Sequence, residues 1–315
     1  MLFRSVAASA VLATLTYALV ERPIRARPTS RLQALSLITA LSIVAVAARI
    51  ITALDGVPER FPSVAAELLA TRYDFKSDAH LGTCWLTATA GADGFDRTCL
   101  PTVGGLFVWG DSHAARLRPG IERMLGARSV IGSATRDVCP PSLRGDGPCE
   151  AGNRRVLERL ATSPPATVVL FAHWSAYAPE IIDDLPALAA RAHASGVRRV
   201  IVIGPAPKWP GKLPTLVYAA WRRGTIDQPF PRRLATELDE GARALDHRMA
   251  GLAWSTGVEY VSLVDLLCTR EGCLTYVPDS ATDLMSYDYG HLTTAGATVV
   301  ARALRLTSES GPRSP

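Results

Sequence analysis

Short apolar runs alternate with longer stretches of helical periodicity over residues 104–307. The apolar runs, which have the length of strands, are residues 106–109, 129–131, 167–172, 199–203 and 259–263. The helical stretches that separate and follow them are residues 113–125, 153–162, 179–194, 231–256 and 293–306. Strands that are apolar throughout are typical of a parallel sheet that helices cover on both faces. The pattern therefore predicts an α/β fold, a three-layer sandwich around a five-stranded parallel sheet.

The N-terminal part of the chain has a different pattern, with two long uncharged segments. Residues 5–20 and 32–48 contain no charged side chain, and each segment is close to the length that crosses a bilayer. The segment between them carries an excess of arginine, at Arg22, Arg25, Arg27 and Arg31. Because arginine-rich loops stay in the cytoplasm, we expect the first helix to run inward and the second outward. A cleaved signal peptide is the alternative for the first segment, although the Glu-Arg-Pro after it is a poor cleavage context.

This topology predicts an inner-membrane protein whose α/β domain lies in the periplasm. The expected parts are a transmembrane helix at 1–21, a cytoplasmic basic loop at 22–31, a second transmembrane helix at 32–54, a periplasmic connector at 55–102, the α/β domain at 103–308 and a polar tail at 309–315. The net charge of +5 is modest, and the sequence has no basic stripe with interleaved aromatic residues. We therefore expect no nucleic-acid partner.

The cysteines agree with an oxidising compartment. There are six, and they fall into local pairs, for which we expect disulfides between Cys84 and Cys99, Cys139 and Cys149, and Cys268 and Cys273. A metal site is the alternative, but the sequence has no C-x-x-C motif. We therefore expect no metal.

Two separate stretches carry candidate chemistry. Ser112 follows the first predicted strand in Gly-Asp-Ser and begins a predicted helix, which is where a nucleophile lies at the carboxyl end of an α/β sheet. Near the other end of the chain, Asp288 and His291 are three residues apart before the last helix, a spacing that lets the carboxylate hold the imidazole toward a serine. The alternatives are a helix N-cap for Ser112 and a structural role for His291.

Together these stretches resemble the SGNH hydrolase superfamily, which has Gly-Asp-Ser after the first strand and Asp-x-x-His before the final helix. The resemblance covers residues 104–307 and implies the flavodoxin-like SGNH fold. The stretches GDSHA, Cys-Pro-Pro at 139–141, VVLFAHW, the Cys268–Cys273 loop and DYGHLTTAGA look like the SGNH domain that is fused to membrane acyltransferase-3 proteins. Residues 17–25 are similar to the end of the acyltransferase-3 membrane domain. We therefore expect the rest of that domain to be encoded separately or to be missing through truncation.

The resemblance assigns catalytic roles to three residues. Ser112 is the expected nucleophile, His291 the general base, and Asp288 the residue that orients the base. Asp111 is expected to stabilise the turn or the helix N-terminus, where a negative charge is favourable. His113 is expected to lie one helical position too far along to be the base.

The resemblance to the superfamily accounts for fewer residues of the oxyanion hole than of the triad. The backbone N–H of Ser112 is one expected donor, and Gly132 is the nearest match to the glycine of the superfamily's second block. The third block normally supplies an asparagine, but this sequence has Ala-His-Trp-Ser at 172–175. His173 and Trp174 are therefore expected to line the site, with packing under the sheet as the alternative.

The resemblance implies an O-acetyltransferase that moves an acetyl group through acyl-Ser112 to hydroxyls of a cell-surface glycan, which is a lipopolysaccharide, peptidoglycan or exopolysaccharide. The inner membrane and this glycan are the other expected partners. An acetyl esterase with the same triad is the alternative, and an inactive glycan-binding or assembly module is a third. No bound cofactor is expected, because the acetyl group would be supplied indirectly, with acetyl-CoA as its ultimate source.

Overall fold

The computed structural model describes residues 2–25, 31–54, 68, 78–91, 94–126, 129–223, 230, 232–234, 240–280 and 282–306. The chain forms two compact units, Met1–Ala66 and Glu67–Pro315. The expected polar tail at 309–315 and most of the expected connector before residue 78 lie outside the described residues.

The first unit consists of helices α1 (Leu2–Thr16), η1 (Tyr17–Glu21), α2 (Arg22–Arg25) and α3 (Arg31–Ala53). Within α3, the segment Ala34–Ala53 has a mean hydropathy of 2.2 and is long enough to cross a membrane. The apolar helix Ser9–Glu21 is shorter. In the described part of the chain, one helix therefore has the length and composition of a membrane span, where the sequence suggested two.

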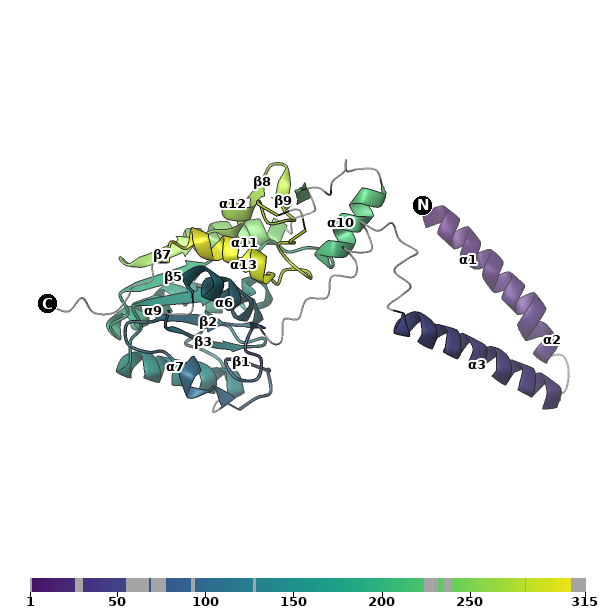
Figure 1. Ribbon diagram of the computed structural model, residues 1–315, viewed down its shortest axis with the longest axis horizontal. Coiled ribbons are helices and arrows are strands. Elements are labelled where there is room, and N and C mark those ends of the chain that lie inside the picture. The colour runs from purple at the N-terminus through teal and green to yellow at the C-terminus, as the bar shows by residue number, and fades with distance from the viewer. Residues whose placement is uncertain are drawn as a thin grey trace. The chain divides into compact units, whose positions relative to one another are not determined.

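The second unit is built on a parallel sheet (Figure 1). Its strands are β1 (Trp85–Leu86), β2 (Leu106–Gly110), β3 (Ile131–Arg136), β4 (Thr167–Phe171), β5 (Arg199–Ile203) and β7 (Val258–Val261). Their order is β1-β3-β2-β4-β5-β7, and all neighbouring strands are parallel. The structure confirms the predicted α/β class and corrects the strand count to six, because β1 lies in the segment expected to be a connector.

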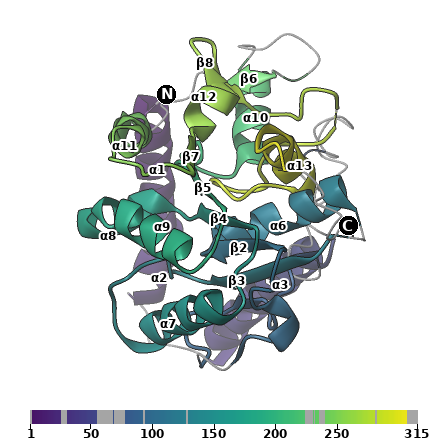
Figure 2. The same ribbon diagram turned by 90° about the vertical axis from the view of Figure 1, so that its left-hand side faces the viewer.

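Helices cover both faces of this sheet, as Figure 2 shows. On one face α6 (Ser112–Leu125) and α13 (Thr294–Ala303) share a hydrophobic cluster with Val108 of β2. On the other face α7 (Gly147–Thr162), α9 (Leu185–Ala194) and α11 (Glu240–Ala250) share a second cluster with Phe107 and Trp109 of the same strand. Each large apolar side chain that is fully buried in this way stabilises the fold by about 1.5–3 kcal/mol.

The remaining elements are short. Helices α8 (Pro179–Asp183), α10 (Leu213–Arg222) and α12 (Leu263–Leu267), and the single turns η4 (Arg97–Cys99) and η5 (Trp174–Ala176), lie in the connections. Strands β6 (Arg233–Leu234), β9 (Gly272–Leu274) and β8 (Cys268–Thr269) form a small antiparallel sheet. The three predicted disulfides are all present, Cys84–Cys99, Cys139–Cys149 and Cys268–Cys273.

Candidate active site

The turn between β2 and α6 places Ser112 at the first position of the helix. A Cβ added to Gly110 would lie 1.7 Å from the carbonyl oxygen of Phe171, so only glycine fits where β2 ends beside β4. Asp111 is the N-cap, and its Oδ1 accepts a hydrogen bond of 2.8 Å from the backbone N–H of His113. Because Asp111 caps the helix, the Ser112 hydroxyl is left for another partner.

That partner is His291, which is 179 residues further along the chain. The Nε2 atom of His291 lies 2.8 Å from Oγ of Ser112, and its Nδ1 atom lies 2.8 Å from Oδ2 of Asp288. The other oxygen of Asp288 accepts hydrogen bonds from the backbone N–H groups of Gly290 (3.0 Å) and His291 (2.8 Å). The structure thus brings the three residues together in one chain of hydrogen bonds.

Asp288 is held in its charged form. Burial alone would raise the pKa of Asp288, but the hydrogen bond and charge of His291, with the two backbone N–H groups, lower it below the ordinary value. A neighbouring segment fixes the loop from outside: the backbone N–H of Trp209 donates to the Tyr289 carbonyl at 2.7 Å, and that of Leu213 to the Asp288 carbonyl at 3.3 Å. The carboxylate can therefore keep His291 in one orientation.

Asp111 is buried and ties two loops together rather than serving His291. Besides capping α6, it accepts hydrogen bonds at Oδ2 from the backbone N–H of His173 (2.8 Å) and from the Tyr177 hydroxyl (2.5 Å). Burial raises the pKa of Asp111, and these donors oppose that rise. The loop after β4 is thereby fixed to the turn that carries Ser112.

His113 and His173 extend the histidine cluster beside His291. The ring centroid of His113 lies 4.4 Å from that of His291 and 4.8 Å from that of His173, on which it stacks. Burial is the main cause that holds the pKa of His113 well below its ordinary value, and the neighbouring His291, His173 and Lys208 lower it further. Burial and the charge of Lys208 lower the pKa of His173 to about 4. Both imidazoles are therefore neutral at neutral pH, and in the described part of the chain their buried Nε2 atoms have no hydrogen-bond partner.

Trp174 does not join this cluster. Its side chain is buried among the residues that α7 and α9 cover, and its indole N–H donates to the carbonyl of Ile203 at 2.7 Å. It borders a pocket with Ser175, Tyr177 and Ile182 on that side of the fold. Of the two residues expected to line the site, His173 lies in the histidine cluster beside the triad, and Trp174 packs under the sheet.

Gly132 lies in the wrong part of its strand for an oxyanion donor. In β3 it pairs with Phe107, three residues before the position level with Gly110, which is about 10 Å along the strand. A Cβ on Gly132 would lie 3.0 Å from the carbonyl oxygens of Cys99 and Leu100, so this glycine accommodates η4. The loop that follows the carboxyl end of β3 contains Val138, a non-glycine residue with a φ of 53°.

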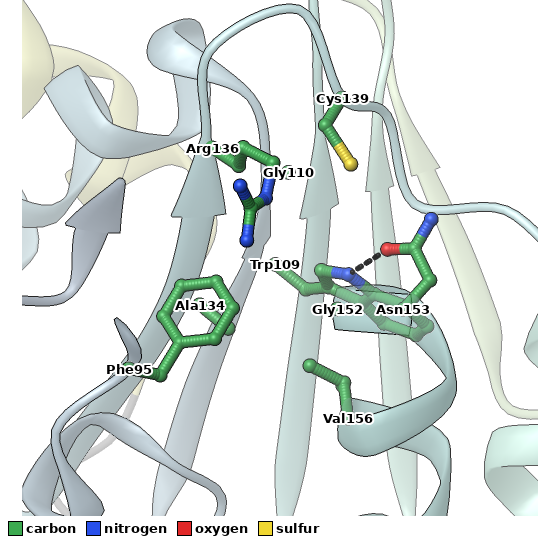
Figure 3. A pocket seen from close by; sticks show the side chains of 9 residues that line it. All are labelled: Phe95, Trp109, Gly110, Ala134, Arg136, Cys139, Gly152, Asn153 and Val156. Carbon is green, nitrogen blue, oxygen red and sulfur yellow. Dashed lines mark hydrogen bonds between the residues drawn. The ribbon is translucent and has the colours of Figure 1, made fainter. Parts of the chain in front are cut away.

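A small pocket lies beside the end of β2, and the side chains that line it bond to the neighbouring loops (Figure 3). Arg136 points into it and donates hydrogen bonds to the carbonyl oxygens of Thr87 (3.1 Å), Ala90 (2.5 Å) and Gly91 (3.1 Å). On the facing helix, Asn153 accepts a hydrogen bond of 2.9 Å from the Trp109 indole and donates one of 3.0 Å to the Pro140 carbonyl. Most of these polar groups have protein partners, which indicates a structural role; Arg136 Nε is buried and has no hydrogen-bond partner among the described residues.

No cluster of three or more His, Cys, Asp or Glu side chains that could hold a metal occurs among the described residues.

The chain was compared with known proteins in three ways. No curated protein matches it. A solved structure, the periplasmic domain of a lipopolysaccharide acetyltransferase from Salmonella ser. Paratyphi A, superposes with a TM-score of 0.63 at 21% identity, over 79% of this chain and 97% of that one. The family model described as the SGNH domain fused to AT3 domains matches residues 72–305. That match begins before residue 103 and takes in β1 and the Cys84–Cys99 disulfide, and by it the chain belongs to this family of SGNH domains.

Proposed function

We propose that this chain is a membrane-anchored periplasmic O-acetyltransferase that acts through an acetyl-serine at Ser112. The observation that carries the proposal is the hydrogen-bonded chain from Ser112 through His291 to Asp288 at the N-terminus of α6. A serine, an imidazole and a carboxylate in this order are the groups that acyl transfer through a covalent intermediate needs.

In the proposed first step, His291 Nε2 takes the Ser112 hydroxyl proton while Oγ attacks the acetyl carbonyl carbon. The resulting oxyanion lies at the N-terminus of α6, where the backbone N–H of Ser112 and the helix dipole stabilise negative charge. When the tetrahedral intermediate collapses, the bond to the donor oxygen breaks and His291 returns the proton to that oxygen. Asp288 keeps the proton of the neutral imidazole on Nδ1, so that Nε2 is free to act as the base.

In the second step a hydroxyl oxygen of the acceptor attacks the carbonyl carbon of the acetyl-serine while His291 takes the hydroxyl proton. The bond between that carbon and Ser112 Oγ then breaks, and His291 returns the proton to Oγ. Transfer to a glycan is supported by the neighbour's description as a lipopolysaccharide acetyltransferase domain. Attachment to the inner membrane is supported by the apolar segment Ala34–Ala53, and the periplasm by the three disulfides. We propose that the acetyl group comes from an acyltransferase-3 membrane partner, with acetyl-CoA as its ultimate source.

The test uses the full chain in detergent with 4-nitrophenyl acetate as donor and with lipopolysaccharide, peptidoglycan fragments or exopolysaccharide as acceptor. We expect acetylated glycan, detected by mass spectrometry, with the wild-type chain and none with Ser112→Ala. Release of free acetate alone, at a rate that no acceptor changes, would favour the esterase instead. The absence of any Ser112-dependent turnover would leave the inactive binding module as the better account.

A further inference from the structure

Arg116 lies one turn after Ser112 on α6 and is 0% exposed. Its guanidinium bonds in two directions. Nη1 and Nη2 donate to the two carboxylate oxygens of Asp78, at 2.5 and 3.3 Å. Nε donates to the backbone carbonyl of Leu292 at 3.2 Å. The helix that carries the nucleophile is thus bonded directly to the residue that follows the general base.

The same group of contacts reaches the start of α13 and the other side of His291. The Thr294 hydroxyl donates to Asp78 at 2.6 Å and lies 3.5 Å from Nη2 of Arg116. The guanidinium carbon lies 5.7 Å from the centre of the Tyr287 ring, and that ring stacks on His291 with centroids 5.9 Å apart and an angle of 16°. Arg116 therefore contacts two groups next to His291, which are the carbonyl of Leu292 and the ring of Tyr287.

Stability is a poor explanation for a buried charge at this place. Removing the Arg116 guanidinium from water costs several kcal/mol, and its partner Asp78, whose side chain is 32% exposed, is partly screened by solvent and offsets little of that cost. The bidentate geometry with Asp78, in contrast, fixes direction as well as distance. A group of this kind is suited to holding a neighbouring segment in one position.

We infer that Arg116, clamped by Asp78, is a positioning residue that holds the loop of His291 at bonding distance from Ser112. The inference rests on the proposed function. It also makes the segment before β2, in which Asp78 lies, part of the machinery that orients the base. Arg116 acts on the loop through the Leu292 carbonyl and the Tyr287 ring.

The test compares Arg116→Met with Arg118→Met in the full chain, using hydrolysis of 4-nitrophenyl acetate. Arg118 is a matched control because it lies on the same helix, is only 7% exposed, and bonds to Glu122 (2.7 Å) and Ser133 (2.8 Å) instead of the histidine loop. We expect Arg116→Met to lower kcat about 10- to 100-fold with KM within about twofold, as for a small displacement of a catalytic group. Arg118→Met is expected to keep kcat within about threefold of wild type. Equal kcat values for the two variants would overturn the inference.

Two further variants separate positioning from folding. Arg116→Met combined with Asp78→Asn leaves no unpaired charge, and Arg116→Lys keeps the charge without the guanidinium fork. We expect both to fold, as shown by thermal unfolding, and both to lose kcat. In a His291→Ala background, Arg116→Met is expected to change the residual rate less than twofold. The same fold loss with and without His291 would show that Arg116 does not act through the base.

A measurement that does not depend on enzyme activity can test this inference separately from the proposed function. The proton between His291 Nδ1 and Asp288 Oδ2 should give a low-field resonance in the proton NMR spectrum of the wild-type chain. We expect Arg116→Met to shift or broaden this resonance and Arg118→Met to leave it unchanged. A resonance unaffected by Arg116→Met contradicts the inference even if the wild-type chain has no activity, an outcome that would itself count against the proposed function.

Discussion

At the scale of single residues, the surroundings of Asp288 and Asp111 shift the pKa values of these two carboxylates in opposite directions. Despite burial, the hydrogen bonds and charge of His291 lower the pKa of Asp288, whereas burial raises the pKa of Asp111 in spite of its bonds from backbone N–H groups and Tyr177. The sequence motifs were sufficient to predict that Ser112, Asp288 and His291 lie together, because each stands next to a predicted helix start. They were not sufficient for the oxyanion donors, since a backbone N–H can come from any residue type.

The first prediction concerns the tautomer of His291. Asp288→Asn keeps the size of the side chain but turns one oxygen into an N–H donor, so it no longer favours a proton on Nδ1. We expect kcat for 4-nitrophenyl acetate to fall about 10³- to 10⁴-fold. Asp265→Asn is the control, because Asp265 lies on the exposed side of α12 and should keep wild-type kcat. A wild-type rate in Asp288→Asn would remove Asp288 from the proposed mechanism.

The second prediction concerns pH. The pKa of His173 is about 4 in the folded chain against an ordinary 6.5, so between these values the unfolded chain binds more protons. The free energy of unfolding should therefore fall as the pH is lowered from 6.5 to 4. Buried His113, whose pKa is also lowered, adds to the same trend. Urea unfolding at a series of pH values measures this, and a stability that rises on acidification through this window would contradict the prediction.

The Lys208 side chain supplies a more selective test of the same electrostatics. Its charge is the second cause of the lowered His173 pKa, after burial, so Lys208→Met should raise that pKa in an NMR titration of the imidazole. Lys212→Met is the matched control, since Lys212 is exposed and does not contribute to the shift. If the His173 pKa moved equally in both variants, the assigned electrostatic cause would be wrong.

At the scale of elements, apolar runs predicted the ends of a strand well where the whole strand is apolar, and poorly where part of it is polar. Strand β5 begins and ends as predicted at residues 199–203, whereas β3 starts at Ile131 and continues to Arg136. Its later residues are polar and buried because they have specific partners: Ser133 bonds to Arg118 and Thr135 to the Cys84 carbonyl. Strand β1 is only two residues long and so leaves no periodic signal.

The two helices that bring the site together pack closely, and this gives a fourth prediction. A Cβ on Gly120 of α6 would lie 2.2 Å from the carbonyl carbon of Ala297 and 2.4 Å from the nitrogen of Thr298 in α13. Gly120→Ala should therefore push α13 away and lower the free energy of unfolding by about 1–3 kcal/mol. Gly251→Ala, at an exposed position where the nearest atom lies 3.4 Å away, should change it by less than about 0.5 kcal/mol. Equal unfolding midpoints in urea would contradict this account of the helix contact.

At the scale of the whole molecule, the disulfides close loops of different length. Cys268 and Cys273 are also paired in the small antiparallel sheet. Cys84–Cys99 closes a loop of sequence separation 15 around β1, whereas Cys268–Cys273 closes one of separation 5. Loop-closure entropy predicts that removing the first bond, by Cys84→Ala with Cys99→Ala, costs about 3 kcal/mol, and removing the second about 2 kcal/mol. Urea unfolding of the two double variants measures the difference, and a larger loss for the short loop would contradict the prediction.

The expected order of parts along the whole chain stays a prediction, and its two expected transmembrane helices differ in the structure. Segments 5–20 and 32–48 look similar by composition, yet of the described helices only Ala34–Ala53 combines sufficient length with sufficient hydropathy. Long-range contacts such as that between Asp78 and Arg116 were not predictable either, because nothing in local periodicity pairs residues 38 positions apart.

The most direct test of the central claim is to look for the acetyl group on Ser112. The full chain is treated briefly with 4-nitrophenyl acetate, quenched in acid, and examined by intact mass and by peptide mapping, alongside Ser112→Ala and His291→Ala. The account predicts a gain of one acetyl group on the peptide that contains Ser112, absent in Ser112→Ala and much slower to form in His291→Ala. Acetylation of equal extent in Ser112→Ala, or on other residues only, would contradict Ser112 as the nucleophile.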